Sequence, residues 1–264
     1  MSGPASGSQS GSRRRGVIRK VGAWPRGSLL GGLGEETREE FLRLGRPRQF
    51  ATGETLMMEG DRTRHVYLLV DGCVKLTANT ESGRLTLLGI RVGGDVVGEF
   101  AALDGQPRVA TVVAAGPCLA RHIPHETFVE FLQLRPEAGL AVNRAVVEKV
   151  RWSTRRRVEF GSFSTLTRLA RVLVELARSY GEPVPEGVMI GVALTQPELA
   201  ALVGAADITV HKALTTLRRA GVLGTGYRRI VLHDLRRLQS FAGQGQNPSE
   251  YEVPGRPGRD SVNI

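Results

Sequence analysis

The sequence is poor in cysteine and in long apolar runs, and each shortage excludes a class of protein. Only two cysteines occur, Cys73 and Cys118, and neither lies at ligand spacing from a second cysteine or a histidine. A disulfide framework, a zinc finger and an iron–sulfur cluster are therefore excluded. The longest apolar run without a charge, Val109 to Ala120, is far shorter than the ~18 residues of a membrane span. We expect no transmembrane helix.

Patterns of catalytic and metal-binding residues are also missing. No Ser-His-Asp or Cys-His set can be read, nor an acidic pair with a nearby base, so we predict that the protein is not an enzyme. The five histidines show no metal-ligand spacing. His122 and His125 flank Pro124 between a predicted strand and a predicted helix, where a structural role is favoured. We expect no bound metal.

Acidic residues are outnumbered, with 26 Asp and Glu against 36 Lys and Arg in 264 residues and a net charge of +10. This excess favours an anionic partner. Hydrophobic residues make up 41% of the chain, which is enough for a sizeable core. Residues 1–26 carry six basic and no acidic side chains and lack the apolar core of a secretory signal. We expect a cytoplasmic protein with a solvated basic tail, although the tail could also steer nucleic acid.

The two ends of the chain differ in composition from its middle. Residues 1–26 and 244–264 are rich in Gly, Ser, Pro and Asn and bury too little apolar surface to offset the entropy of ordering. We predict that both tails are disordered. Between 45 and 125, short Val/Leu/Ile runs are broken by glycine, which is typical of an antiparallel β-barrel or sandwich. Within it, residues 65–77 predict a strand, a tight Asp-Gly turn and a second strand.

A long helix is predicted from Pro136 to about Phe160, because apolar residues recur at three-and-four spacing without an interrupting proline. These residues form a stripe along one side of the helix. The stripe is too long for one β-domain to cover, so we predict that it pairs with a second copy of the chain. The sequence 161–164 interrupts the helix and marks a hinge. The stripe consists of Ala138, Val142, Ala145, Val146, Lys149, Val150 and Ser153.

The carboxy-terminal part predicts a helix-turn-helix. Thr195 and Glu198 form a capping box, Gly204 ends the first helix, and a second helix runs over 207–220. Residues 222–232 look like a hairpin wing beside the second helix. An ordinary packed helical pair is the alternative. The candidate DNA contacts are Gln196, Asp207, Thr209, His211, Lys212, Arg228 and Arg229.

The sequence 98–111 joins a glycine, a carboxylate and an arginine in a region otherwise sparse in charge. Arg108 offers a planar fork for a phosphate, and Glu99 can accept from ribose hydroxyls, while Gly98 lets a phosphate approach the backbone closely. Chemistry alone leaves a second interpretation open, in which Glu99 and Arg108 simply pair with each other.

These motifs together resemble the CRP/FNR family of dimeric bacterial transcription regulators, specifically its cyclic-AMP receptor protein branch. The stretch from Gly98 to Arg108 is similar to that family's phosphate-binding cassette, and 195–220 looks like its helix-turn-helix. The resemblance implies an α+β fold: a cyclic-nucleotide-binding-like β-roll over 27–135, a dimerisation helix over 136–161, and a winged helix-turn-helix domain over 162–243.

The resemblance also implies roles for single residues. Glu99 would bind the ribose 2′-hydroxyl, Arg108 the cyclic phosphate, and Ser153 and Thr154 on the long helix the purine. Val109 stands where the family has a small or hydroxyl residue touching the phosphate, which removes a donor.

The recognition helix departs from the family as well. Asp207 and Ile208 stand where the cyclic-AMP branch has Arg-Glu, and Lys212 replaces a second Arg, so the preferred operator should differ. Asp207 should either cap its helix or accept from a cytosine amine.

We therefore predict a homodimeric DNA-binding transcription regulator that is controlled by a cyclic nucleotide, most simply cyclic AMP, and that works with RNA polymerase. Two alternatives stay open. One is a family member whose degenerate pocket binds no ligand or another nucleotide, such as cyclic di-GMP. The other is a cyclic-nucleotide-binding module for protein interaction, in which the helix-turn-helix only packs.

Overall fold

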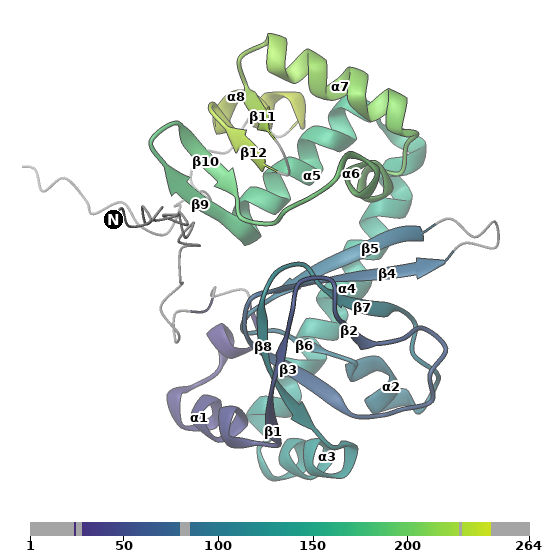
Figure 1. Ribbon diagram of the computed structural model, residues 1–264, viewed down its shortest axis with the longest axis vertical. Coiled ribbons are helices and arrows are strands. Elements are labelled where there is room, and N and C mark those ends of the chain that lie inside the picture. Colours follow the sequence, from purple (N-terminus) through teal and green to yellow (C-terminus); the bar gives the residue numbers. More distant parts are fainter. Residues whose placement is uncertain (1–23, 25–27, 80–84, 227–228, 244–264) are drawn as a thin grey trace, which may run out of the picture.

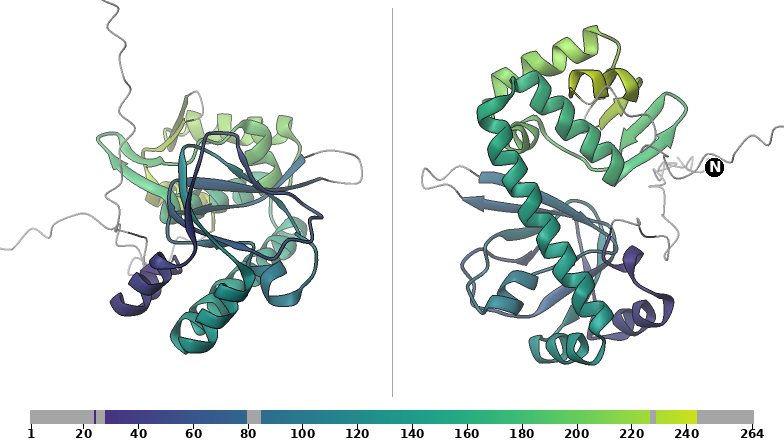
Figure 2. Two further views of the ribbon diagram at one scale, coloured as in Figure 1. Left: turned by 60° about the horizontal axis from the view of Figure 1, so that its bottom comes forward. Right: turned by 180° about the vertical axis from the view of Figure 1, so that it is seen from behind.

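The computed structural model describes residues 24, 28–79, 85–226 and 229–243. The predicted tails lie almost wholly outside them. A β-domain and a carboxy-terminal domain are joined by one long helix, which runs behind the β-domain in Figure 1 and in front of it in Figure 2 (right). The predicted α+β fold is confirmed. The helices are α1 (Glu35–Arg43), α2 (Glu99–Asp104), α3 (His125–Leu134), α4 (Pro136–Ser162), α5 (Thr165–Tyr180), α6 (Gln196–Val203), α7 (Asp207–Arg219) and α8 (Leu235–Phe241), with a 3-10 turn at Leu30–Gly32.

The β-domain consists of two four-stranded antiparallel sheets. One has the strand order β1-β8-β3-β6 and the other β2-β7-β4-β5, so consecutive strands often lie in different sheets. The strands are β1 (Arg46–Phe50), β2 (Thr55–Met57), β3 (Val66–Asp71), β4 (Cys73–Asn79), β5 (Leu85–Val92), β6 (Val96–Val97), β7 (Thr111–Ala114) and β8 (Cys118–Ile123).

The Asp71–Gly72 turn is a corner between the sheets and does not close a hairpin. Strands β3 and β4 form where the sequence predicts them, but β3 pairs with β6 and β8, whereas β4 pairs with β5 and β7. The strand, turn and strand predicted over residues 65–77 are therefore all present, but the two strands do not pair with each other. Gly72 is needed at the corner because its φ is +89° and a Cβ there would lie 2.5 Å from the Pro117 carbonyl oxygen.

Strand β3 is buried on both faces, which explains its unbroken apolar run. Val66 and Leu68 pack in one core with α1, α3 and the start of α4. Tyr67 and Leu69 face the other way, into the core between the two sheets. The strand thus joins the sandwich to the helices that cover it.

Helix α4 is the long helix that the sequence predicts, but the first part of its stripe packs against the chain's own β-domain. Ala138 and Val142 are buried in the core of the chain's own β-domain, and Ala145 packs against it. The assignment of these positions to a partner chain was wrong, because the β-domain already covers them. The opposite side of α4 carries its own exposed apolar residues, Leu140, Val147, Val150 and Val158.

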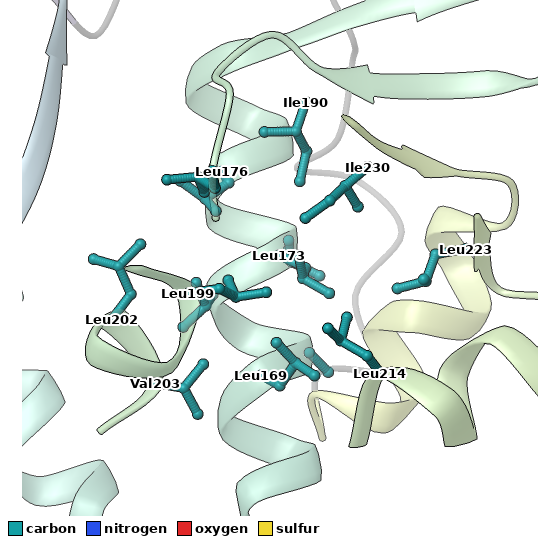
Figure 3. Packing of buried hydrophobic residues seen from close by; sticks show 14 of the residues in the cluster. Leu169, Leu173, Leu176, Ile190, Leu199, Leu202, Val203, Leu214, Leu223 and Ile230 are labelled. Carbon is teal, nitrogen blue, oxygen red and sulfur yellow. The ribbon is translucent and has the colours of Figure 1, made fainter. Parts of the chain in front are cut away.

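The carboxy-terminal domain is built around α5, whose leucines meet α6, α7 and a small sheet in one core (Figure 3). Helix α6 starts at the predicted capping box of Thr195 and Glu198, and Gly204 ends it with φ +66°. The predicted hairpin is confirmed as β11 (Leu223–Gly226) and β12 (Arg229–Leu232). Two further strands, β9 (Gly181–Val184) and β10 (Gly187–Ile190), complete the sheet in the order β11-β12-β10-β9 and were not predicted.

The two domains contact each other through the β4–β5 ribbon. Leu87 and Ile90 of β5 belong to the core of the carboxy-terminal domain. Lys75 of β4 is buried and donates to the Ala193 carbonyl at 2.7 Å and to the Glu198 carboxylate at 2.7 and 2.8 Å. The β-domain is therefore bonded to the first turn of the helix-turn-helix.

Candidate functional site

The cassette predicted over 98–111 begins at the junction of β6 and α2. Gly98 precedes α2 with φ +87°, a conformation that favours glycine. A Cβ at this position would lie 2.6 Å from Nη1 of Arg108 and 2.9 Å from Cε of Met57. Glycine is therefore required both by the backbone conformation and by the close approach of the arginine.

Arg108 is held inside the cassette by the backbone around it. Its side chain is buried and donates to the carbonyl oxygens of Gly98 at 2.8 Å and His65 at 2.5 Å, and to Oγ1 of Thr63 at 3.3 Å. Burial lowers the pKa of the guanidinium, whereas the nearby Glu99 carboxylate raises it. An arginine has five N–H groups, so two remain for an anionic ligand.

Glu99 is paired with Lys149 of α4 and not with Arg108. The Lys149 ammonium donates to Oε1 of Glu99 at 2.7 Å and to the Val96 carbonyl at 3.3 Å. Only 7% of the Glu99 side chain and 17% of the Lys149 side chain are exposed. Burial lowers the pKa of Lys149, and the Glu99 carboxylate opposes this shift. The interpretation that Glu99 and Arg108 only neutralise each other was wrong.

Sequence reasoning missed the role of Lys149, although the signal was present. It is the one charged residue in the stripe that was assigned to dimer contacts. A lysine in an apolar stripe needs a buried carboxylate, and Glu99 supplies it from the first turn of α2.

The remaining predicted ligand residues, Ser153, Thr154 and Val109, are all exposed. Ser153 and Thr154 are exposed on α4, the first of them one turn after Lys149, and Oγ1 of Thr154 donates to the Val150 carbonyl at 3.0 Å. Val109 is 54% exposed next to the buried Arg108. The structure does not bring Ser153 or Thr154 within hydrogen-bonding distance of Glu99 or Arg108.

A histidine that sequence reasoning did not single out lies behind Arg108. Nε2 of His65 is buried and has no hydrogen-bond partner among the described residues, and its ring lies 4.5 Å from the ring of His122, centroid to centroid. Burial, followed by the nearby Arg108 and His122, lowers the pKa of His65 to about 4. His65 is therefore neutral at neutral pH, which favours the charged state of the arginine beside it.

The second candidate site is the outer face of α7. Thr209, His211 and Lys212 are exposed there, while Val210 and Leu214 on the inner face are buried. Asp207 is the first residue of the helix and does not cap it, since Ala206 occupies the N-cap position. The predicted capping role of Asp207 is therefore wrong, and its contact with a cytosine amine stays a prediction.

Gln196 at the start of α6 is bonded to α7. Its Nε2 donates to the Asp207 carbonyl at 3.2 Å, and its Oε1 lies 3.3 Å from Nδ1 of His211. Arg218 bonds to Thr215 at 2.8 Å and to Thr225 of the wing at 3.0 Å, so it joins α7 to β11. These bonds fix the recognition helix relative to its neighbours.

The wing extends the same face. Arg229 is exposed at the start of β12, opposite Gly226 in the β11–β12 ladder. Arg228, the other predicted wing contact, lies outside the described residues.

A buried arginine cassette bonded to a long helix, followed by a winged helix-turn-helix, defines a ligand-sensing DNA-binding protein. Two family models agree with this class. The chain matches the cyclic nucleotide-binding domain over residues 47–135 and the Crp-like helix-turn-helix domain over residues 167–241. The chain belongs to the CRP/FNR family and is a DNA-binding transcription regulator with a cyclic nucleotide-binding domain.

Relatives agree with this assignment. The chain is 27% identical over 192 residues to a CRP-like cAMP-activated global transcriptional regulator of Mycobacterium tuberculosis, which covers 73% of this chain and 86% of the relative. It is 29% identical over 187 residues to the global nitrogen regulator of Synechococcus elongatus, covering 70% and 84%.

Two solved structures share the fold. A CRP-family transcriptional regulator of Thermus thermophilus, TTHB099, superposes with a TM-score of 0.62 at 26% identity, covering 74% of this chain and 96% of that one. FixK2 of Bradyrhizobium japonicum gives a TM-score of 0.65 at 21% identity, covering 75% and 97%.

Neither a metal cluster nor a membrane span is found among the described residues. They contain no group of three or more His, Cys, Asp or Glu side chains that could hold a metal ion. Among the helices in this part of the chain, none is long and apolar enough to cross a membrane.

The Glu99–Lys149 pair can be tested by a double-mutant cycle. Lys149→Met leaves a buried carboxylate without its cation and should lower the free energy of unfolding by about 3 kcal/mol. Combining it with Glu99→Gln should cost clearly less than the sum of the two single changes, because the orphaned charge is gone. Urea unfolding measures all four proteins. The exposed pair of Arg43 and Glu39 serves as control, since Arg43→Met should change stability by less than about 0.5 kcal/mol. Additive effects at 99 and 149 would contradict the pairing.

Proposed function

We propose that this protein is a homodimeric transcription regulator that binds cyclic AMP in the cassette and responds to it by changing its affinity for DNA. The observation that carries the proposal is the bond between Glu99 of the cassette and Lys149 of α4. A ligand that contacts Glu99 acts directly on the helix that leads to the DNA-binding domain. The cAMP-activated relative in Mycobacterium tuberculosis supports the choice of nucleotide.

Each part of cyclic AMP has a partner in this proposal. The cyclic phosphate binds the two remaining N–H groups of Arg108, and the ribose 2′-hydroxyl donates to Oε2 of Glu99, since Lys149 engages Oε1. Ser153 lies four residues after Lys149 and faces the purine of its own protomer. Val109 supplies no donor to the phosphate, so the affinity depends on Arg108 more than it would with a hydroxyl residue there.

The exposed side of α4 supports the proposed homodimer. Val147, Val150, Thr154 and Val158 follow one another at three-and-four spacing, and the three valines are 49% to 62% exposed. A helix face of this kind is covered when two copies pack side by side. Thr154 lies on this face, so it reaches toward the ligand of the other protomer.

In a dimer, the angle between the two α4 helices sets the separation of the two α7 helices. Two half-sites on one face of DNA lie about 34 Å apart, one helical turn, so a small rotation at the Phe163–Ser164 hinge is enough to switch binding. We infer that the protein works in the cytoplasm, where it meets both DNA and its further partner, RNA polymerase.

Ligand binding depends on Arg108 in this proposal. Arg108→Ala should abolish cyclic AMP binding in calorimetry, because a phosphate inside the cassette loses its charge-assisted bonds. Arg62→Ala removes the same charge from an exposed position in the β-domain and should leave the affinity unchanged. Unchanged cyclic AMP binding by the Arg108 variant would refute the assignment of the cassette as the ligand site. If wild type binds cyclic di-GMP and not cyclic AMP, the choice of nucleotide is wrong. If it binds neither and Val109→Ser restores binding, the pocket is a degenerate one.

The assembly depends on the exposed face of α4. Val150→Asp places a carboxylate at the centre of this face and should convert the dimer to a monomer, because burying an unpaired charge costs more than one valine contributes. Leu134→Asp, at an exposed apolar position on α3, should leave the dimer intact. Sedimentation velocity distinguishes the two states. A monomeric wild type would refute the homodimer.

We assign base-specific contacts to Lys212 and sequence-independent phosphate contacts to Arg229. Lys212→Ala should relax sequence preference at one base pair per half-site, at roughly 1 to 3 kcal/mol, because its ammonium donates to guanine O6 and N7. Arg229→Ala should weaken specific and random DNA alike and lower the salt slope by about one unit. Binding measured on both DNAs over a range of salt decides the matter. A uniform loss in the Lys212 variant would show that this residue contacts only phosphates.

A further inference from the structure

A second hollow lies between the two domains, apart from the cassette. It has a volume of about 590 Å³ and is lined by β5, the middle of α4 and the end of α5. Figure 2 (right) shows α4 and α5 diverging from the hinge, with the β-domain below. Glu99 and Arg108 do not line this cleft, whereas Lys149 lies between the cleft and the cassette.

The charges in the cleft are unevenly matched. Lys149 and Arg156 have buried or half-buried carboxylate partners, Glu99 and Glu175. Arg91, Arg151 and Arg155 also line the cleft and form no ion pair with any residue that the structure describes. The carboxylates left to balance them are Asp95 and Glu148. Burial raises the pKa of Asp95, whereas the nearby Arg91 and Lys149 oppose this shift. The cleft therefore has an excess of positive charge.

Arg91 shows this excess most directly. Its Nε is buried with no hydrogen-bond partner in the described part of the chain, and its Nη1 donates to the carbonyl of the preceding residue, Ile90, at 2.6 Å. Buried donors are nearly always paired in folded proteins, and an unpaired one on a cation is the more costly case. It also lies close enough to Lys149 to lower the pKa of that ammonium. Two neighbouring cations at the wall of a cavity favour a bound anion.

The rest of the wall is apolar and aromatic. Trp152 and Tyr180 line the cleft together with Val172 and Leu176. Tyr180 is fixed by a hydrogen bond from its hydroxyl to the Ile90 carbonyl at 3.0 Å, and the Arg156 guanidinium lies 5.0 Å from the centre of the Trp152 ring. A cavity of this size, with rigid aromatic side chains beside a cluster of arginines, fits a small molecule that carries both an aromatic ring and several negative charges.

The cleft stays accessible in the proposed dimer. Its residues on α4, at positions 145, 148, 149, 152, 155 and 156, follow helical spacing on one side of the helix. The exposed apolar face at 147, 150, 154 and 158 lies on the opposite side. A partner helix on that face leaves the cleft uncovered.

We propose that the cleft is a second ligand site, which binds a nucleoside polyphosphate. The phosphates bind Arg91, Arg151 and Arg155, and the nucleoside packs against Trp152 and Tyr180. Because β5 belongs to the β-domain and α5 to the DNA-binding domain, the ligand bridges the two and stabilises this arrangement of the domains over others. The site does not depend on what the cassette binds.

Calorimetry on the full chain at low salt, with ATP as the probe, tests the proposal. Wild type should bind ATP, and the affinity should fall as salt rises, because the arginines supply the attraction. Tripolyphosphate and adenosine separate the two halves of the site, and each should bind at least tenfold more weakly than ATP. Tripolyphosphate binding as tight as ATP would refute the nucleoside part. No ATP binding at any salt concentration would overturn the proposal.

Variants locate the bound ATP. Arg91→Met and Arg155→Met should each weaken ATP binding at least tenfold, the second at an exposed position where folding is not at risk. Arg46→Met removes one charge from exposed β1 and should leave ATP affinity unchanged. Arg108→Ala should keep ATP binding while losing cyclic AMP. If the Arg108 variant instead loses ATP binding while the Arg91 and Arg155 variants keep it, ATP occupies the cassette and the proposal of a second site is wrong. A variant that loses cyclic AMP binding but keeps ATP binding tests the cassette and not the cleft.

Discussion

A buried ion pair between Glu99 and Lys149 joins the cyclic nucleotide-binding domain to the long helix that leads to the DNA-binding domain. Neither charge could remain where it is without the other, because an unpaired charge at that depth would have to neutralise or draw in water. Lys149 lies near the middle of a helix of 27 residues that continues without a break to Ser162. A displacement at Lys149 is therefore carried to the hinge by a rigid element rather than dissipated in a loop.

The hinge itself is closely bonded to the helix-turn-helix. Arg168 of α5 donates to the carbonyls of Phe160 and Phe163 on one side and of Val203 and Gly204 on the other. A Cβ on Gly204 would lie 2.2 Å from the Phe160 ring, so the end of α4 packs directly against the turn between α6 and α7. Motion at the hinge thus moves the two DNA-binding helices as one body.

The ends of the helices could be predicted because neighbouring residues set them. The pairing of the strands could not, because it depends on contacts between residues far apart in the sequence. The capping box at Thr195 and the stop at Gly204 are set by neighbouring residues, and both are present in the structure. The separation of β3 and β4 into different sheets depends on pairing with β6, β7 and β8, which no local turn signal encodes.

The cassette also combines features that are set locally with a contact between residues far apart in the sequence. Its glycine, carboxylate and arginine were identified from residue type and spacing. The partner of Glu99, however, lies 50 positions further along the chain, on a helix that is apolar on two sides. Periodicity alone could not tell which side meets the β-domain and which is left exposed, so Lys149 was placed with the dimer contacts.

The bond from Lys75 to Glu198 restricts how this sequence can vary. Glu198 completes the capping box of α6 through Thr195 and accepts both hydrogen bonds of the ion pair with β4. Glutamine at 198 would preserve the cap but leave the buried Lys75 ammonium without a counter-charge. Substitutions that a free-standing helix-turn-helix would tolerate are therefore tolerated here only together with a change at position 75. The two positions, in different domains and 123 residues apart, are expected to covary.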